Sequence, residues 1–122
     1  MIVFPHARNR THSMGGNHIV GVATPGSGAQ QVELWRGSMD AGSVTPPHRH
    51  DGEEVVLFLS GSGRATVDGE EVRYAAGDTL ILPAHAEHQI FAETHSEFVS
   101  AMPLGGAVSL PDGTVMDLPW RA

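Results

Sequence analysis

Two histidines separated by one residue, His48 and His50, are followed by Glu54 at the start of the apolar run EVVLFLS. Successive side chains of an extended chain point to opposite faces. These three even-numbered residues therefore point the same way if the segment stays extended across the turn predicted at residues 51 and 52. Imidazole and carboxylate groups are costly to bury unpaired, and a divalent metal removes that cost by binding neutral imidazole nitrogens and a carboxylate oxygen. The spacing predicts a metal site.

A fourth ligand is expected from GDTLILPAHAEHQIF (77–91), which contains His85 and His88. His88 is the better candidate because it begins a β-prone run whose next even position, Ile90, extends the same inner face. His85 follows Pro83 and is interpreted as a turn residue, with a place in the pocket as the alternative. Protons compete with a metal for imidazole nitrogens, so metal occupancy is expected to fall below about pH 6.

The elements that must position these residues are short. The chain has 122 residues, of which 15 are glycine and 8 are proline, and this composition favours strands joined by turns over long helices. Turn signals separate β-prone runs at the spacing typical of an all-β sandwich or barrel. The eight predicted strands are 18–24, 31–39, 54–60, 64–67, 71–75, 79–83, 88–93 and 97–103. Residues 68–70 (DGE) predict a tight hairpin turn.

Composition also limits the domain organisation and the partners. One domain is expected, with an irregular N-terminal arm at 1–16 and a single barrel with a C-terminal extension at 17–122. No cysteine is present, so any metal ligands are nitrogen and oxygen atoms. A net charge of −7 argues against nucleic acid and anionic membranes as partners. No apolar run is long enough to span a bilayer, and a cytoplasmic protein is expected.

Two longer patterns now carry a resemblance to a known family. Residues from Gly42 to Gly61 read G-x5-H-x-H-x3-E-x6-G, and residues from Gly77 to His88 read G-x5-P-x4-H. These resemble the two motifs of the cupin superfamily. The resemblance implies a double-sheet jelly-roll β-barrel. It departs from the family at two positions, where His85 replaces a glycine and Ala92 replaces an asparagine.

By this resemblance one divalent metal ion is held by His48, His50, Glu54 and His88. Three neutral histidines and one carboxylate leave a charge of about +1 on the ion, and two positions of an octahedron remain open for a ligand. Iron, manganese, nickel, cobalt, zinc and copper all suit these ligands.

Such a site predicts a metal-dependent enzyme that acts on a small oxygen-rich organic molecule, and the resemblance implies, as a class, a dioxygenase-like oxidoreductase. Two alternatives remain open: an isomerase, lyase or cyclase, and a non-catalytic barrel that binds a small ligand. Glu53 is interpreted as solvated, with acid–base work as its alternative. The further pocket candidates are Trp35, Phe58, Arg64, Tyr74, His85, Gln89 and Ile90. The predicted surface histidines are His6, His12 and His18, and His95 is interpreted as a loop residue.

The odd positions of the run at 54–60 predict a partner. Val55, Leu57 and Leu59 alternate with the inner face, so this strand is apolar on both sides. A terminal segment of the chain or a second subunit is expected to cover the outer side. The resemblance implies the second subunit, and thus a homodimer.

Overall fold

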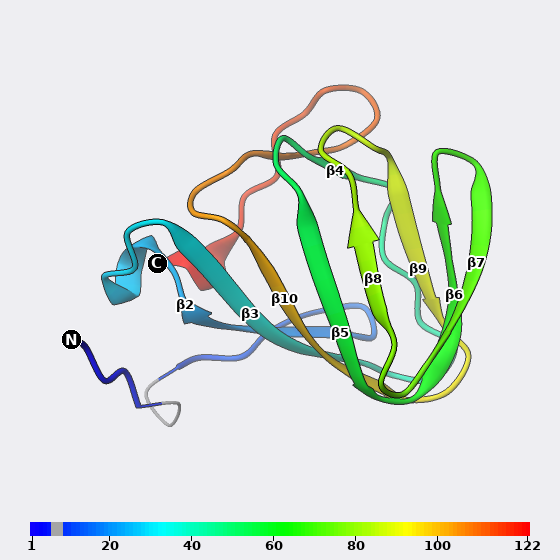
Figure 1. Cartoon of the computed structure of the whole chain (residues 1–122), viewed down its shortest axis with the longest axis horizontal. Coiled ribbons are helices and arrows are strands. Elements are labelled where there is room, and N and C mark those ends of the chain that lie inside the picture. The colour runs from blue at the N-terminus through cyan, green and yellow to red at the C-terminus, as the bar shows by residue number, and fades with distance from the viewer. Residues whose placement is uncertain (6–8) are drawn as a thin grey trace.

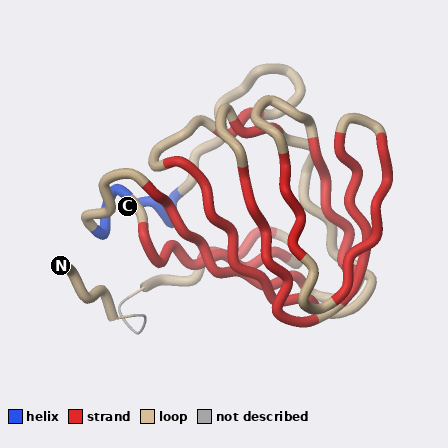
Figure 2. Tube along the Cα trace, in the orientation of Figure 1, coloured by secondary structure: helices blue, strands red, loops and turns tan. Residues whose placement is uncertain are grey.

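The structure is a computed structural model in which residues 1–5 and 9–122 are described. His6, predicted to be a surface residue, lies outside them. The described residues form eleven strands and two short 3-10 helices (Figures 1 and 2). The elements are β1 (His12–Met14), β2 (Asn17–Ala23), η2 (Pro25–Ser27), β3 (Val32–Met39), β4 (Arg49–His50), β5 (Glu54–Ser60), β6 (Ser62–Val67), β7 (Glu70–Ala75), β8 (Thr79–Leu82), β9 (His88–Ala92), β10 (Ser96–Pro103), β11 (Val108–Ser109) and η3 (Pro119–Arg121).

The strands form two layers that face each other, as Figure 1 shows. One layer is an antiparallel sheet of six strands in the order β1-β2-β3-β10-β5-β8. The other contains β7-β6-β9 and the pair β11-β4. The main core cluster joins the layers, since Val56 and Phe58 of β5 pack with Ala65 of β6 and Ile90 of β9. The predicted double-sheet jelly-roll barrel is confirmed.

The chain between β3 and β5 completes the second layer. Val44 bridges to Phe91 and His48 bridges to His88, so residues 44–50 run beside β9. Pro46 and Pro47 interrupt this ladder because proline has no backbone N–H to donate. Regular pairing resumes only at β4, which pairs with β11. This irregular segment places His48 and His50 in the layer that holds β9.

All eight predicted strands are present, with ends displaced by at most two residues. The predicted hairpin turn consists of Asp68 and Gly69, whose φ angles are 48° and 81°. Positive φ at both central residues is the requirement of a type I′ hairpin, which explains the Asp-Gly pair. His85 also has a positive φ, 67°, so the residue that replaces the family's glycine adopts the left-handed conformation glycine favours.

Three strands were not predicted, and one of them corrects the irregular arm at 1–16. Residues His12–Met14 form β1, which pairs with β2 through a turn containing Gly15. The other two, β4 and β11, have two residues each and are too short to show a period. The tail packs back onto the barrel, where Val108 and Leu118 join Trp35 in a second apolar cluster.

The outer face of the six-stranded sheet differs from the expectation for the strand at 54–60. Glu54, Val56 and Phe58 are buried as predicted, but Leu57 and Leu59 are 39% and 50% exposed. No described segment of the chain covers them. None of the described helices is long and apolar enough to cross a membrane.

Candidate metal centre

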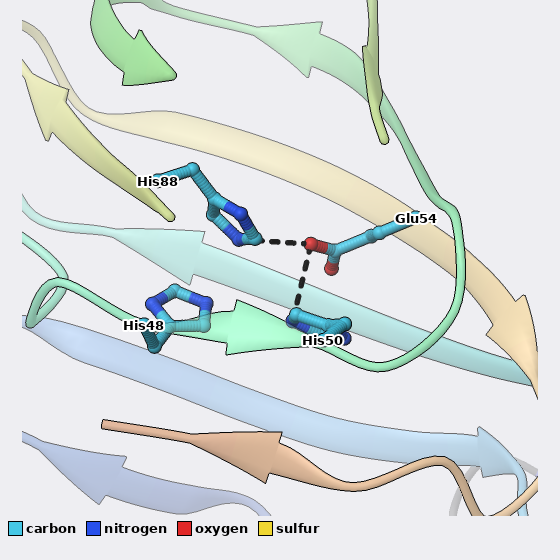
Figure 3. A group of neighbouring side chains, drawn as sticks. All are labelled: His48, His50, Glu54 and His88. Carbon is cyan, nitrogen blue, oxygen red and sulfur yellow. Dashed lines mark ion pairs between the residues drawn. The ribbon is translucent and has the colours of Figure 1, made fainter. Parts of the chain in front are cut away.

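The four predicted ligands come together between the two layers (Figure 3). His48 and His50 lie on the segment that forms β4, and His88 begins β9 as the bridge partner of His48. Glu54 begins β5 and belongs to the opposite, six-stranded sheet. The extended run across residues 51 and 52 assumed from the sequence is therefore wrong, because the chain turns there from one sheet to the other.

The ligand atoms of His48, His50, Glu54 and His88 all lie within 4.8 Å of one another. Nε2 of His50 and Nε2 of His88 are each 3.3 Å from Oε1 of Glu54. The rings of His48 and His88 have centroids 4.2 Å apart. His48 is partly buried and the other three are buried. One ion at the centre of this group can reach a nitrogen or oxygen atom of each residue.

Backbone carbonyls orient two of the imidazoles. Nδ1 of His48 lies 2.7 Å from the carbonyl oxygen of Pro46, and Nδ1 of His88 lies 3.2 Å from that of Ala86. Each Nδ1–H donates to its carbonyl, which leaves Nε2 without a proton and ready to bind a metal. The turn that contains His85 supports the site through its backbone, since the backbone N–H of His85 donates to the carbonyl oxygen of His50.

Burial holds the group in the ionisation state that a metal requires. It lowers the pKa of His48 to about 4, helped by the charge of His88, and it also lowers the pKa of His50. Burial alone would raise the pKa of Glu54, but contact with His88 and the charge of His50 outweigh it, so the pKa of Glu54 is lowered. At neutral pH His48 and His50 are therefore neutral beside the ionised carboxylate of Glu54.

The contact between His88 and Glu54 tests whether a cation fits. Nε2 of His88 is buried and has no hydrogen-bond partner among the described residues, although Oε1 of Glu54 lies 3.3 Å away. With the His88 proton on Nδ1, two acceptor atoms face each other in a buried site, which is unfavourable. A divalent cation would bind both atoms and remove this conflict. The side chains therefore fit a metal ion.

We expect metal affinity to depend less on pH between about pH 7 and 5 than three ordinary imidazoles would make it. A lowered pKa keeps the metal-binding neutral form of His48 present at more acidic pH, so the loss of metal predicted near pH 6 moves to lower pH. Titration calorimetry in two buffers with different ionisation enthalpies counts the protons displaced. At pH 6 metal binding should displace fewer than the roughly two protons expected from three ordinary imidazoles. Displacement of two or more would contradict this expectation.

A cavity adjoins the four-residue group. Trp35 and Ile90 line it, as predicted for pocket residues. The described residues lining it are Met14, Asn17, Ile19, Trp35, Thr45, Pro46, His48, His50, Glu54, Val56, His88, Ile90, Phe98, Ser100, Val108, Met116, Leu118 and Trp120. The metal group therefore lies at the wall of a space bounded largely by apolar side chains.

Five other pocket candidates lie outside this cavity. Phe58 and Tyr74 stack on each other in the core, with ring centroids 3.7 Å apart. Arg64 pairs with Glu71, His85 is exposed, and Gln89 lies on β9 between two inward-facing residues. Side chains alternate between the two faces of a strand, so Gln89, which is adjacent to the inward-facing His88, points away from the cavity.

Glu53 and the other described histidines take no part in the site. Glu53 and His95 are exposed, in agreement with the sequence interpretation. His12 and His18 are partly buried, and His18 lies 3.1 Å from a carboxylate oxygen of Asp40.

The sequence interpretation missed the C-terminal wall of the cavity and the buried carboxylate that anchors it. Glu33 on β3 has no exposed surface and accepts hydrogen bonds from Trp35 Nε1, Gly105 N and Arg121 Nε. The Arg121 contact is 2.6 Å long and holds η3, where Trp120 packs edge-on against Trp35. The alternation of side chains along β3 could have indicated that Glu33 is buried, because Glu33 and Trp35 are two residues apart and share the inward face.

Comparison with known proteins identifies the family. Residues 35–101 match the model of the Cupin domain family, and this segment is more than half of the chain. The protein belongs to the cupin family.

The proteins that are similar to this chain are named for different functions. Auxin-binding protein 4 of Zea mays is 27% identical over 92 residues, which cover 68% of this chain and 45% of that protein. Dimethylsulfoniopropionate lyase DddW of Ruegeria pomeroyi is 48% identical over 42 residues, 34% of this chain and 28% of that protein. The salicylate 1,2-dioxygenase structure from Pseudaminobacter salicylatoxidans aligns with a TM-score of 0.66 at 20% identity, covering 71% of this chain and 26% of that one. The chain spans about half the length of the auxin-binding proteins it matches.

Proposed function

We propose that the protein is a mononuclear metal-dependent cupin that acts on a small oxygen-containing organic molecule as a dioxygenase-like oxidoreductase. The observation that carries this proposal is the group of three histidines and one glutamate at the wall of an apolar cavity. His48, His50, Glu54 and His88 would hold the metal, which supplies Lewis-acid and redox chemistry when bound. Iron, manganese, nickel, cobalt and copper fit a redox role, whereas zinc fits only the Lewis-acid role.

The composition of the cavity favours oxidation over proton transfer. Apart from the four metal-site residues, no described side chain that lines the cavity is ionisable at neutral pH. An isomerase, lyase or cyclase needs a general acid or base within reach of the substrate. The lyase activity for which DddW is named therefore supports only the second candidate. The activity of salicylate 1,2-dioxygenase agrees with the first.

A non-catalytic role in binding is the other candidate, and one comparison favours it. The auxin-binding proteins are named for a ligand that they bind. A cavity without an acid–base residue agrees with binding as well as with oxidation. The proposed compartment is the cytoplasm, which suits a fold that has no disulfide.

Oxygen uptake distinguishes these candidates. Elemental analysis of untreated protein would first identify the bound metal, and oxygen consumption would then be screened with aromatic and hydroxylated acids on protein loaded with that metal. Metal-dependent oxygen uptake that His88→Ala removes would support the dioxygenase. Tight ligand binding without oxygen uptake or conversion would support the binding role, and conversion without oxygen uptake would support the isomerase or lyase.

We also propose that the protein forms a homodimer through the outer face of the six-stranded sheet. Leu57 and Leu59 on β5 and Ile81 on β8 are 39%, 50% and 61% exposed on this face. Arg36 on β3 and Glu97 on β10 add opposite charges to the same face. A two-fold axis brings identical faces together, so Arg36 of one copy can meet Glu97 of the other.

Charge placed on this face should separate the two copies. We expect the wild-type protein to sediment at twice the 12.9 kDa mass of the chain. Leu57→Asp introduces like charges that face each other across a two-fold interface and should shift the protein to the monomer. Val72→Asp, at an exposed position on β7 in the other layer, is the matched control and should remain dimeric. A wild-type protein that sediments as a monomer at micromolar concentration would contradict the proposal.

A further inference from the structure

The walls of the cavity restrict the chemistry of its ligand. Trp35 on β3 and Trp120 on η3 meet edge-on, with ring centroids 5.1 Å apart, and both line the cavity. Met116 and Leu118 continue this wall along the C-terminal segment. These flat and flexible apolar side chains offer extensive contact area. Among the described residues, the lining atoms Asn17 Oδ1 and Trp120 Nε1 are buried without a hydrogen-bond partner, but they are too few for a ligand rich in hydroxyl groups. Burying such hydroxyl groups without hydrogen bonds would be costly.

Charge restricts the ligand further. Among the described residues, no lysine or arginine lines the cavity, and Glu54 is the only carboxylate that does so. A divalent metal held by Glu54 and three neutral histidines would leave a single net positive charge at that end. One anionic group on the ligand balances this charge, whereas a second would remain buried and unpaired.

Size gives the third restriction. The cavity volume is about 100 Å³. A dry apolar cavity of roughly 150 Å³ is sufficient for benzene. The space next to the metal group is therefore suited to no more than one ring, part of which would extend through the open side of the cavity.

Asn17, Thr45 and Ser100 are the neutral polar side chains with an amide or hydroxyl group that line the cavity among the described residues, and Ser100 is the most buried of the three. Ser100 on β10 is 2% exposed and lines the cavity. Its neighbours across the sheet are Trp35 and Val56. No hydrogen bond to its hydroxyl group is present among the described residues, so the hydroxyl can donate to an oxygen atom of the ligand.

We infer that the ligand of this site is a compact monocarboxylate with an apolar body of about one ring. Its apolar body packs against Trp35 and Trp120, and the Ser100 hydroxyl contributes a hydrogen bond. The inference rests on the proposed metal site and names the substrate class of that site. It excludes sugar acids, dicarboxylates and cations as good ligands.

Three probe molecules test the inference by binding alone. Protein containing its measured complement of metal is titrated with benzoate, glucuronate and benzylamine, using calorimetry and tryptophan fluorescence. Benzoate should bind at least about tenfold more tightly than the other two, because only benzoate combines one negative charge with an apolar body. Glucuronate or benzylamine binding as tightly as benzoate, or no benzoate binding to metal-containing protein, would overturn the inference.

Variants separate the contribution of each wall. Trp120→Ala should weaken benzoate at least about fivefold through lost aromatic contact. Phe91→Ala, which removes an aromatic ring that contacts Arg64 and does not line the cavity, should leave benzoate affinity unchanged. Ser100→Ala should weaken benzoate about threefold with unchanged metal content. Equal benzoate affinity in the wild type, Trp120→Ala and Ser100→Ala would contradict the assignment of these walls.

The outcomes also distinguish this inference from the proposed function. Protein that takes up no stoichiometric metal would overturn the proposed function at its first step. Metal-containing protein that binds benzoate but consumes no oxygen with any substrate would support the inference and contradict the dioxygenase. Metal-dependent oxygen uptake with a sugar acid as the best substrate would support the dioxygenase and contradict the inference.

Discussion

His50→Ala is expected to abolish stoichiometric metal binding at neutral pH. The substitution removes one of four convergent ligand atoms and leaves Glu54 Oε1 with the two remaining imidazoles. Loss of an outer-shell partner typically weakens a metal site by roughly 10- to 100-fold, and loss of a direct ligand should cost at least about 100-fold. Elemental analysis after dialysis and competition with a chromophoric chelator would measure this loss.

The same variant should lose its thermal response to chelators. A ligand that binds only the folded state adds about 2.7 kcal/mol at a concentration of 100 times its Kd, so removal of the metal should lower the Tm of the wild type. His50→Ala should show no further decrease with chelator, and His88→Ala should behave likewise.

The matched control for both measurements is His85→Asn. His85 is an exposed histidine with φ of 67°, and asparagine tolerates this conformation. The control should retain one metal ion per chain and the chelator response. Unchanged metal affinity in His50→Ala or His88→Ala would show that the ion does not bind at this centre.

Arg121→Ala should have a large effect on stability although Arg121 lies outside the metal centre. Glu33 is fully buried, and Arg121 donates to its Oε2 atom over 2.6 Å. Breaking a buried ion pair leaves an uncompensated charge and costs about 3–5 kcal/mol. A cost of about 3 kcal/mol is expected here, because the C-terminal segment can detach and let water reach Glu33. Urea denaturation would measure it.

Tryptophan fluorescence would report where the damage occurs. Trp120 lies beside Arg121 on η3 and packs against Trp35, so detachment should shift the emission of the folded protein to longer wavelength. Arg73→Ala removes an exposed ion pair with Glu93 and serves as the control. Such surface pairs contribute about 0–1 kcal/mol.

A double-mutant cycle isolates the pair itself. In a Glu33→Gln background Arg121 no longer faces a buried carboxylate, so Arg121→Ala should cost clearly less than in the wild type. If Arg121→Ala lowers the free energy of unfolding no more than Arg73→Ala, the pair does not hold the C-terminal segment on the barrel.

The sequence alone determined those parts of the protein that depend on local spacing. The strand at 54–60 alternates with a period of two, and an Asp-Gly pair between two β-prone runs requires a hairpin turn. The same short-range patterns identified His48, His50 and Glu54 as the members of one group. These features depend on backbone geometry within a few residues, and nearby sequence is sufficient to specify it.

Tertiary structure alone decided how these parts meet. The even numbering of His48, His50 and Glu54 suggested that the three side chains meet along one extended strand. Instead the chain changes sheets after His50, and the Glu54 carboxylate approaches from the opposite layer. Glu33 and Arg121 are separated by 88 positions, and no local pattern pairs them. Packing of the two sheets decides such contacts. The folded state is stabilised when apolar surface is covered and buried charges are paired, whatever the separation of the residues along the chain. The position of Trp120 over the metal cavity follows from that packing and not from spacing.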